Sequence, residues 1–445
     1  MKAPRRFGIA ATSVLAALVL GSQAAGAQDV DETDWRSVDR GGGPYERLIV
    51  RGATLIDGTG APKRGPVDIV VEGERIVEIR SVGSPGGGID PDSRPSGATR
   101  EIDARGDYVL PGFVDNHVHA GARGEEPEIP DHLWSYRLWL AHGVTTVRGV
   151  ALGENLEWGL EQKRLSAQGD IVAPRIFECA KRPGSEPEFQ SNDLMTPEAG
   201  RKWVRYAAEK GADCLKLGDY APGMMRPPVM RAILDEADEQ DLGTTAHLHQ
   251  TGVAQMNALD MARAGLAGMT HFYGLFESMY EDRDIQPFST GYNYADEQDR
   301  FGEVGEQWRM IPGQGSEEWD SLIQSFLERD FFINPTMTIY EASRDVRRAR
   351  TAPWHDEYTL PTHWDFFQPS YENHGSYYYD WTTHHETAWN NFYDRWMKFL
   401  DDYKDAGGRV TAGSDSCCIY KLHGFAYVRE LELLQEAGFT PLEVI

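Results

Sequence analysis

Two histidines close together at the end of an apolar run are the first residues whose spacing could support chemistry. The stretch VLPGFVDNHVHAG, residues 109–121, passes from apolar residues through Asp115 to His117 and His119. Residues i and i+2 of a strand point to the same face, so both imidazoles would project together. This arrangement is typical of a metal site, although a strand-end histidine is more often an ordinary hydrogen-bonded polar group.

Further residues of the same kind follow at the ends of later predicted strands. They are Lys216, His247, His249, His271 in AGMTHFYG and Asp415 in RVTAGSDS. In a barrel of parallel strands the carboxyl ends form one face, so residues this far apart in the sequence would converge. Several imidazoles and a carboxylate suit a divalent cation of borderline softness such as zinc. The sequence therefore predicts a metal site.

The elements that must position these residues are strands alternating with helices. Eight short apolar runs are candidate strands, at 109–114, 144–148, 175–179, 213–217, 243–249, 268–273, 331–338 and 408–413. Helical stretches such as PEAGRKWVRYAAEKGA and PPVMRAILDEADEQDLG lie between them, the latter expected to close at Gly243. This alternation predicts an α/β fold with a (β/α)8 TIM barrel. A doubly wound sheet is disfavoured because no G-x-G-x-x-G turn is present.

The chain divides into a β-rich and an α/β region. Residues 28–107 hold β-branched runs that predict antiparallel strands, the N-terminal part of a small β-sandwich whose remainder is missing. The loop 81–98 is predicted to be a loose surface loop. Residues 108–439 form the predicted barrel, interrupted by aromatic and acidic insertions at 274–315 and 340–390. These insertions are interpreted equally well as a lid over the barrel mouth or as surface elaboration. The histidines of the second insertion are predicted to be ordinary loop histidines.

Both ends of the chain carry signals of their own. Residues 1–27 combine a basic start, a short apolar segment and a small-x-small site, which predicts a secretory signal peptide and a secreted or periplasmic protein. At the other end Thr440 and Glu443 announce a new helix in TPLEVI, so residues 440–445 are expected to begin a truncated C-terminal region.

Charge and cysteine content narrow the classes of partner. The formal net charge is −26, which argues against nucleic acid and anionic membrane surfaces as partners, since both require basic patches. The four cysteines are Cys179, Cys214, Cys417 and Cys418, with no CxxC spacing. A cysteine zinc site is therefore disfavoured, and buried free thiols are favoured over a disulfide. The expected partner is a small-molecule substrate, and a homo-oligomer is left open.

The order HxH, Lys, His, His, Asp resembles the amidohydrolase superfamily of metal-dependent hydrolases. The resemblance extends to GATLIDGTG, GFVDNHVH, GVTTVRG, GSDS and ELELLQEAGFTPLEVI. It is nearest to the branch of imidazolonepropionase-like proteins and bacterial Xaa-Pro or Xaa-Arg dipeptidases. The resemblance implies two divalent cations, with Lys216 carbamylated by CO2 so that its carbamate bridges them.

The resemblance also implies a role for each site residue. His117, His119 and Asp415 would hold the more buried cation, and His271 would hold the other with one histidine of AHLHQ. Strand alternation cannot separate His247 from His249, but the family pattern favours His247.

The same resemblance implies a reaction. Asp415 would take a proton from a water bridging the cations, the resulting hydroxide would attack a carbonyl, and Asp415 would return the proton to the leaving nitrogen. His249 and Tyr273 would stabilise the oxyanion. Arg148 would pair with a substrate carboxylate or be structural, both readings being open, and Asp115 would orient its neighbours.

The expected function is that of a secreted binuclear hydrolase of amide bonds in cyclic amides or small peptides. Lactone or ester hydrolysis is a near alternative, because the same hydroxide attacks either carbonyl. A mononuclear deaminase is disfavoured, because deaminases of this superfamily favour a glutamate where Gln250 and Thr251 follow the fifth-strand histidines. A non-enzymatic binding protein is disfavoured because no metal ligand is lost.

Overall fold

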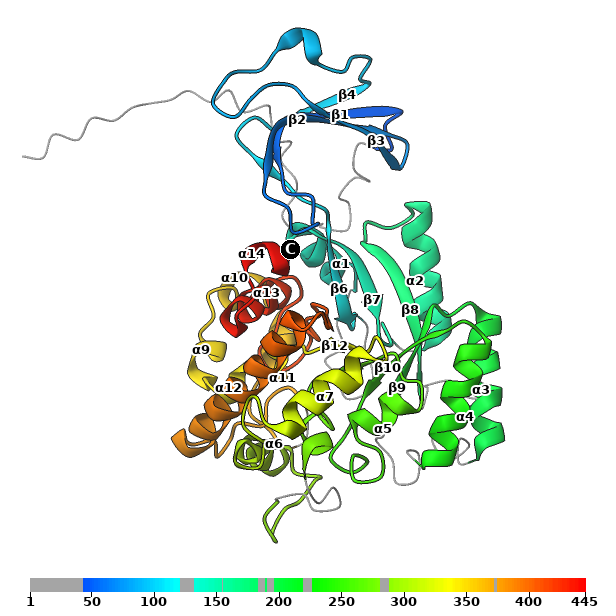
Figure 1. Ribbon diagram of the computed structural model, residues 1–445, viewed down its shortest axis with the longest axis vertical. Coiled ribbons are helices and arrows are strands. Elements are labelled where there is room, and N and C mark those ends of the chain that lie inside the picture. The colour runs from blue at the N-terminus through cyan, green and yellow to red at the C-terminus, as the bar shows by residue number, and fades with distance from the viewer. Residues whose placement is uncertain are drawn as a thin grey trace, which may run out of the picture. The chain divides into compact units, whose positions relative to one another are not determined.

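The computed structural model describes residues 43–120, 132–153, 155–182, 189, 196–218, 226–280, 288–371 and 374–445 (Figure 1). The predicted signal peptide lies outside these residues. Residues 44–445 form one compact unit that contains two β-sheets. Among the helices that the structure describes, none is long and apolar enough to cross a membrane.

The smaller sheet comprises β1 (Arg47–Leu55), β2 (Arg64–Glu72), β3 (Arg75–Ser81), β4 (Arg100–Asp103) and β5 (Tyr108–Val109). Strands β1, β2 and β3 are antiparallel, as predicted, but β4 and β5 both pair with β1 in parallel. The antiparallel pairing predicted for the first three strands is therefore confirmed, and the parallel pairing of β4 and β5 with β1 was not predicted.

The connection between β3 and β4 is also better anchored than a loose loop. Arg94 donates two hydrogen bonds of 2.9 Å to the carboxylate of Asp68, which is fully buried in β2. Arg51 of β1 donates to the same carboxylate at 2.8 Å. A buried carboxylate needs such partners, so Asp68 holds the loop against the sheet.

The larger sheet has eight parallel strands in chain order, separated by helices (Figure 1). The strands are β6 (Phe113–Val118), β7 (Val144–Gly149), β8 (Arg175–Arg182), β9 (Cys214–Gly218), β10 (Gly243–His247), β11 (Gly268–Thr270), β12 (Phe332–Asn334) and β13 (Arg409–Val410). The main helices are α1 (His132–Ala141), α2 (Leu156–Gln168), α3 (Pro197–Lys210), α4 (Pro227–Glu239), α5 (Ala258–Arg263), α7 (Glu317–Leu327), α12 (Thr383–Asp405) and α13 (Phe425–Ala437). The mixed α/β class is confirmed.

The sheet is curled, so that its first strand meets the segment after its last strand. Asn116 donates its backbone N–H to the carbonyl of Ala412 at 3.1 Å, and Asp415 donates to the carbonyl of His117 at 2.9 Å. Val118 also forms a parallel bridge with Ser416. The two ends of the sheet therefore share the backbone positions around which the candidate site is built.

Some predicted boundaries were wrong for identifiable reasons. The predicted strand 109–114 is divided: Val109 ends β5 in the small sheet, and β6 begins only at Phe113. Pro111 has no N–H to give to a ladder, which separates the two strands. Helix α4 ends at Glu239, and Gly243 opens β10 instead of closing the helix.

The ends of other helices follow the sequence signals. Helix α3 begins after Thr196, which caps the N–H of Ala199, and ends at Gly211 with φ of 91°. Thr440 and Glu443 form the predicted capping box of α14 (Pro441–Val444).

The two insertions form compact helical segments. The first contains the 3-10 helix η3 (Phe276–Met279) and α6 (Glu297–Glu306), and the second includes α9 (Val346–Arg350), α11 (Pro361–Phe366) and the first turns of α12. Their aromatic residues pack together, as Phe301 stacks on Tyr377 with centroids 4.4 Å apart. The predicted bounds of the second insertion, 340–390, include the start of α12, a helix of 23 residues. The aromatic composition of this stretch concealed the helical pattern.

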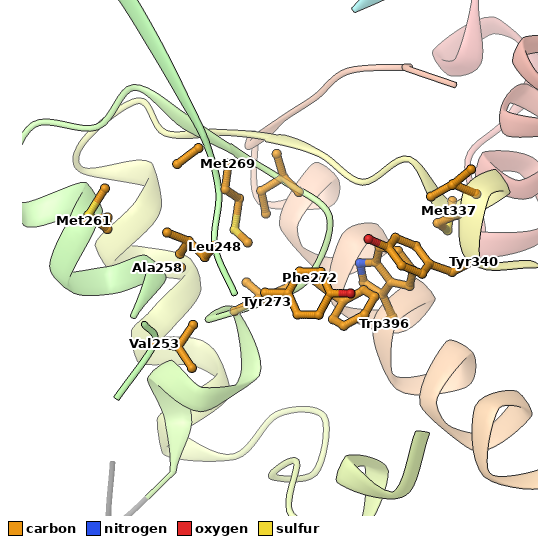
Figure 2. Packing of buried hydrophobic residues seen from close by; sticks show 14 of the residues in the cluster. Leu248, Val253, Ala258, Met261, Met269, Phe272, Tyr273, Met337, Tyr340 and Trp396 are labelled. Atoms are coloured by element: carbon orange, nitrogen blue, oxygen red, sulfur yellow. The ribbon is translucent and has the colours of Figure 1, made fainter. Parts of the chain in front are cut away.

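A continuous apolar core supports strands β10 and β11. Leu248, Met261 and Met269 lie on one side of the close-up in Figure 2, and Phe272, Tyr340 and Trp396 meet on the other. Phe272 lies 4.9 Å from the Tyr340 ring and 5.0 Å from Trp396, edge to face. Because Leu248 and Phe272 are fixed in this core, the polar residues beside them emerge in fixed directions.

The cysteine prediction was partly wrong. Cys179 and Cys214 form a disulfide, whereas Cys417 and Cys418 are buried and belong to no disulfide. Cys179 of β8 lies directly opposite Cys214 of β9 in the parallel ladder, with their Cα atoms 4.3 Å apart. The sequence separation of 35 gave no sign of this pairing, which depends on the register of the two strands.

Candidate metal centre

The predicted ligands converge on the carboxylate of Asp415. One of its oxygens, Oδ1, lies 3.3 Å from Nε2 of His117 and 3.2 Å from Nε2 of His119. Its other oxygen, Oδ2, lies 3.6 Å from Nε2 of His271. Ligand atoms of His117, His271 and Asp415 all lie within 4.8 Å of one another. The structure thus brings together residues from the first, sixth and eighth strands of the larger sheet.

Strand ends and left-handed turns aim these side chains. His117 lies inside β6 and is 1% exposed, whereas His119 follows the last residue of that strand. His271 and Asp415, which follow β11 and β13, have φ of 66° and 48°. Such a conformation is uncommon for residues other than glycine and is concentrated at functional sites. Here it turns each side chain toward the same point.

Hydrogen bonds to Nδ1 decide which imidazole nitrogens face Asp415. His119 Nδ1 lies 2.9 Å from the carbonyl of Ala151, which can only accept, so Nδ1 carries the hydrogen. His271 Nδ1 lies 2.5 Å from Oγ1 of Thr336, which already donates to the Pro335 carbonyl at 2.7 Å and must therefore accept from His271. In the neutral imidazoles both Nε2 atoms then present lone pairs to the carboxylate.

Burial favours these neutral imidazoles. It holds the pKa of His117 well below its usual value and lowers that of His271 to about 3. Burial also opposes ionisation of Asp415, and a positive charge on the adjacent imidazoles, His117 foremost, would keep the pKa of its carboxyl well below the usual range. Neutral imidazoles leave that positive charge to a bound cation. Lone pairs facing an anionic carboxylate repel each other unless a cation lies between them. The donor set therefore fits a borderline divalent cation such as zinc.

Lys216 of β9 contacts the same group of ligands through His117. Its Nζ lies 3.2 Å from His117 Nε2 and 3.4 Å from Oγ1 of Thr270, and the residue is 4% exposed. Thr270 donates its own hydrogen to the carbonyl of Ala246 at 3.1 Å, so it can accept from the lysine. A buried amine beside the histidines is placed where a carbamate would add anionic oxygens.

The structure separates the two histidines that alternation could not. Strand β10 ends at His247, so His249 lies outside the strand and no longer follows its alternation. The His247 ring lies 4.3 Å from that of His271. His249 instead pairs through Nδ1 with the hydroxyl of Tyr294 in the first insertion. His247 is thus directed toward the metal ligands and His249 toward the insertion.

Tyr273 lies beside the ligand candidate His247, whereas Arg148 contacts Asn116 and Phe332 within the sheet. The Tyr273 ring stacks on that of His247 at 5.3 Å with an angle of 17°, and burial raises the pKa of its hydroxyl. Arg148 donates from Nε to the carbonyl of Asn116 at 2.8 Å and covers the ring of Phe332, the first residue of β12. Phe332 marks the end of β12 opposite to the carboxyl end, so the described contacts of Arg148 favour its structural reading.

Asp115 supports the turn that carries Asp415. Its carboxylate accepts from the N–H of Ser414 at 2.9 Å, from Oγ of Ser414 at 2.6 Å and from the N–H of His117 at 3.2 Å. It is fully buried, and burial raises its pKa to about 7. This carboxylate therefore acts on the ligands through the backbone, in the orienting role predicted for it.

Three residues near the site were missed from the sequence. Thr336 follows the apolar run FFINP and could have been found as the polar end of the seventh strand. Tyr294, which contacts His249, and Arg300, which lies beside Tyr294, come from the first insertion, where no strand pattern indicates a direction.

Known proteins resemble parts of this chain. Residues 108–279 match the family model described as the amidohydrolase family. The chain is 25% identical over 228 residues to a 5-methylthioadenosine/S-adenosylhomocysteine deaminase of Desulforudis audaxviator, covering 46% of this chain and 49% of that protein. It is 27% identical over 226 residues to a dihydroorotase of Anaeromyxobacter dehalogenans, covering 50% of this chain and 47% of that protein. The chain thus spans about half the length of the curated relatives it matches.

Solved structures extend the likeness of fold over more of the chain. A Xaa-Pro dipeptidase with bound methionine in its active site matches with a TM-score of 0.56 and 16% identity, covering 90% of this chain and 86% of that one. At this identity the likeness shows the fold alone.

Proposed function

We propose that this chain, which belongs to the amidohydrolase superfamily, is a metal-dependent hydrolase of carbon–nitrogen bonds in small molecules. The observation that carries the proposal is the convergence of His117, His119 and His271 on Asp415, with Lys216 beside them. We infer that the curled sheet closes as a (β/α)8 barrel, whose carboxyl-end face is where barrel enzymes place their active sites.

The proposed site holds two cations. His117, His119 and Asp415 would bind one, and His271 and His247 the other, with carbamylated Lys216 between them. The support for two sites is that His271 adjoins both Asp415 and His247. When bound, divalent cations supply Lewis acidity toward a carbonyl and lower the pKa of a coordinated water.

The protein's own groups would handle the proton and the developing charge. Asp415 is the carboxylate of the described ligand cluster and would accept the proton of the attacking water and then donate it to the leaving nitrogen. Tyr273 keeps its hydroxyl proton because burial raises its pKa, so it can donate to an oxyanion. His249, held by Tyr294, would be the second donor.

Deamination is the second candidate, because the relatives that the chain matches include deaminases. The residue that opposes it is Gln250, which follows His249 and is 3% exposed. An amide does not titrate and cannot replace the glutamate that deaminases use to move protons. Lactone hydrolysis would use the same groups as amide hydrolysis.

We also propose that the protein is exported. The expected signal peptide and the Cys179–Cys214 disulfide support this, because disulfides persist in oxidising compartments.

The test is metal analysis combined with a substrate screen on the full chain. We expect about two divalent cations per chain and turnover of at least one class among dipeptides, N-acyl amino acids and cyclic amides, with lactones and adenine nucleosides as competing classes. Asp415→Asn should abolish turnover. Less than about one cation per chain, or turnover of adenine nucleosides alone, would overturn the proposal.

The role of Lys216 needs a separate experiment. Protein prepared with ¹³C-bicarbonate should show one carbamate resonance that is absent from Lys216→Met, and this variant should lose about one cation per chain. A wild-type protein with two cations and no carbamate resonance would leave the hydrolase standing but exclude carbamylation.

A further inference from the structure

Arg300 of α6 is a buried cation beside the candidate site. It is 8% exposed, although it lies in the first insertion. Its guanidinium carbon lies 4.4 Å from the ring centre of Phe301 and 5.1 Å from that of Tyr294. Aromatic faces attract a cation, but they accept no strong hydrogen bond from a guanidinium. The side chain therefore still requires acceptors.

The acceptors in the described structure do not meet this requirement. The buried Nε of Arg300 has no hydrogen-bond partner. Nη1 lies 3.8 Å from a carboxylate oxygen of Glu297, which is beyond hydrogen-bond distance. Glu297 gives both of its oxygens to Nδ1 of His374, at 2.7 and 2.6 Å. A buried guanidinium with five donors is costly unless an anion completes it.

A short series of contacts connects this guanidinium with the metal ligands. The ring of Tyr294 lies next to Arg300, and its hydroxyl pairs with His249. The His249 ring lies 4.3 Å from that of His247, which lies 4.3 Å from His271. Arg300 therefore faces the side of the centre where His249 lies.

We propose that Arg300 binds a carboxylate of the substrate, so that the hydrolase acts on small amides with a free carboxylate, such as N-acyl amino acids or dipeptides. This rests on the proposed function and names its substrate class. A guanidinium presents parallel N–H groups that match the two oxygens of a carboxylate. The rings of Tyr294 and Phe301, which contact Arg300, and that of Tyr273, which stacks on His249, suit the apolar part of such a molecule.

Arg148, for which the sequence left a carboxylate-binding and a structural role equally open, makes its described contacts elsewhere. Its Nε donates to the carbonyl of Asn116, and its guanidinium covers Phe332 within the sheet. Nε of Arg148 is committed to the backbone of β6, whereas the buried Nε of Arg300 has no hydrogen-bond partner among the described residues.

The test compares each carboxylate substrate with its carboxamide in wild-type protein and in Arg300→Gln and Arg300→Lys. The wild type should prefer the carboxylate. Arg300→Gln should reduce kcat/KM for the carboxylate at least about 30-fold, mainly through KM, while kcat/KM for the carboxamide changes less than about 3-fold. Arg300→Lys keeps the positive charge but loses the paired N–H groups of the guanidinium. Its kcat/KM for the carboxylate should therefore lie between those of the wild type and Arg300→Gln. Arg309→Gln is the matched control, since Arg309 is exposed and pairs with Glu306.

Binding and activity separate the two proposals. If the wild type hydrolyses amides without preferring carboxylates, or Arg300→Gln affects both members of a pair equally, the role of Arg300 is excluded while the hydrolase stands. If no amide is hydrolysed, the proposed function fails, and calorimetric binding of an N-acetyl amino acid and its amide to the zinc-loaded protein still tests Arg300. Equal binding by wild type and Arg300→Gln would overturn the inference. Melting temperature and metal content show whether each variant is folded, and Arg300→Lys supplies the result if Arg300→Gln is not.

Discussion

Thr336 determines which nitrogen of His271 faces Asp415. Its hydroxyl donates to Pro335 and accepts from Nδ1 of His271, so Nε2 is left for a cation. Thr336→Val should therefore weaken metal binding about 10- to 100-fold, which is typical for losing a group that orients a ligand. Competition with a chelator measures this.

The neighbouring Thr338 provides the control for this prediction. It is also fully buried, but its Oγ1 has no hydrogen-bond partner. Thr338→Val should leave metal affinity unchanged. Equal effects of the two substitutions would show that the tautomer of His271 does not depend on Thr336.

Glu341 is a buried carboxylate that accepts hydrogen bonds from two cationic side chains. It accepts from Lys421 at 2.9 Å and from Arg429 at 2.9 and 2.7 Å. Burial opposes its ionisation, but Lys421 and Arg429 together lower its pKa to about 2. Because the folded pKa is depressed, its contribution to stability is present above about pH 4.5 and is lost as the pH falls toward 2.

We expect Glu341→Gln to lower the free energy of unfolding at pH 7 by about 3–5 kcal/mol, because Lys421 is left as an unpaired buried charge. Denaturant titration measures this. Glu328→Gln, at a surface pair with Arg329, should change stability by less than about 1 kcal/mol. A loss of similar size in both variants would contradict the prediction.

At the scale of elements, α13 holds the short helix α8 (Met337–Tyr340) that follows Thr336. Glu430 of α13 accepts from the N–H groups of Met337 at 3.0 Å and Thr338 at 2.7 Å, two donors at the start of that helix. Burial raises the pKa of Glu430 to about 8. A raised pKa contributes stability below about pH 4.5, and this contribution is lost as the pH rises through about 8.

The free energy of unfolding should therefore fall between pH 5 and pH 8.5 by more in the wild type than in Glu430→Gln, which does not titrate. Urea unfolding at the two pH values gives the comparison. Glu432 is exposed on the same helix, and Glu432→Gln should show the same fall in the free energy of unfolding between the two pH values as the wild type. If Glu430→Gln also shows the wild-type fall, a group other than Glu430 causes the pH dependence of stability.

Elements also show what the sequence could predict. The apolar runs predicted all eight strands of the larger sheet, because burial on both faces of a parallel strand leaves a clear signal. The ends were harder to predict, because Pro111 divides one run and β10 ends at His247. For that reason His247 and His249 looked equivalent in the sequence and are not equivalent in the structure.

At the scale of the whole molecule, topology made the convergence of His117, Lys216 and Asp415 predictable, because parallel strands of one curled sheet end on one face. Nothing comparable applied to Arg300 and Tyr294, whose positions depend on how an insertion packs. The Cys179–Cys214 pair likewise depends on strand register, which composition does not reveal.

That disulfide joins strands β8 and β9 across the intervening α3, so it constrains the unfolded chain. The Cys179→Ala, Cys214→Ala double variant should lose about 2–4 kcal/mol of stability in denaturant titration. Reduction of the wild type should produce a similar loss and leave the variant unchanged. A reductant that destabilises both equally would show that the bond is not the cause.

The seam between β6 and the segment after β13 has a consequence for biosynthesis. Asp115 binds Ser414 across 299 residues of sequence, and Asp415 donates its N–H to His117. A growing polypeptide that has passed residue 271 already carries its histidines but lacks the carboxylate on which they converge. The centre can therefore be assembled only after residue 415 has left the ribosome, so ligation must follow the synthesis of all eight strands of the larger sheet.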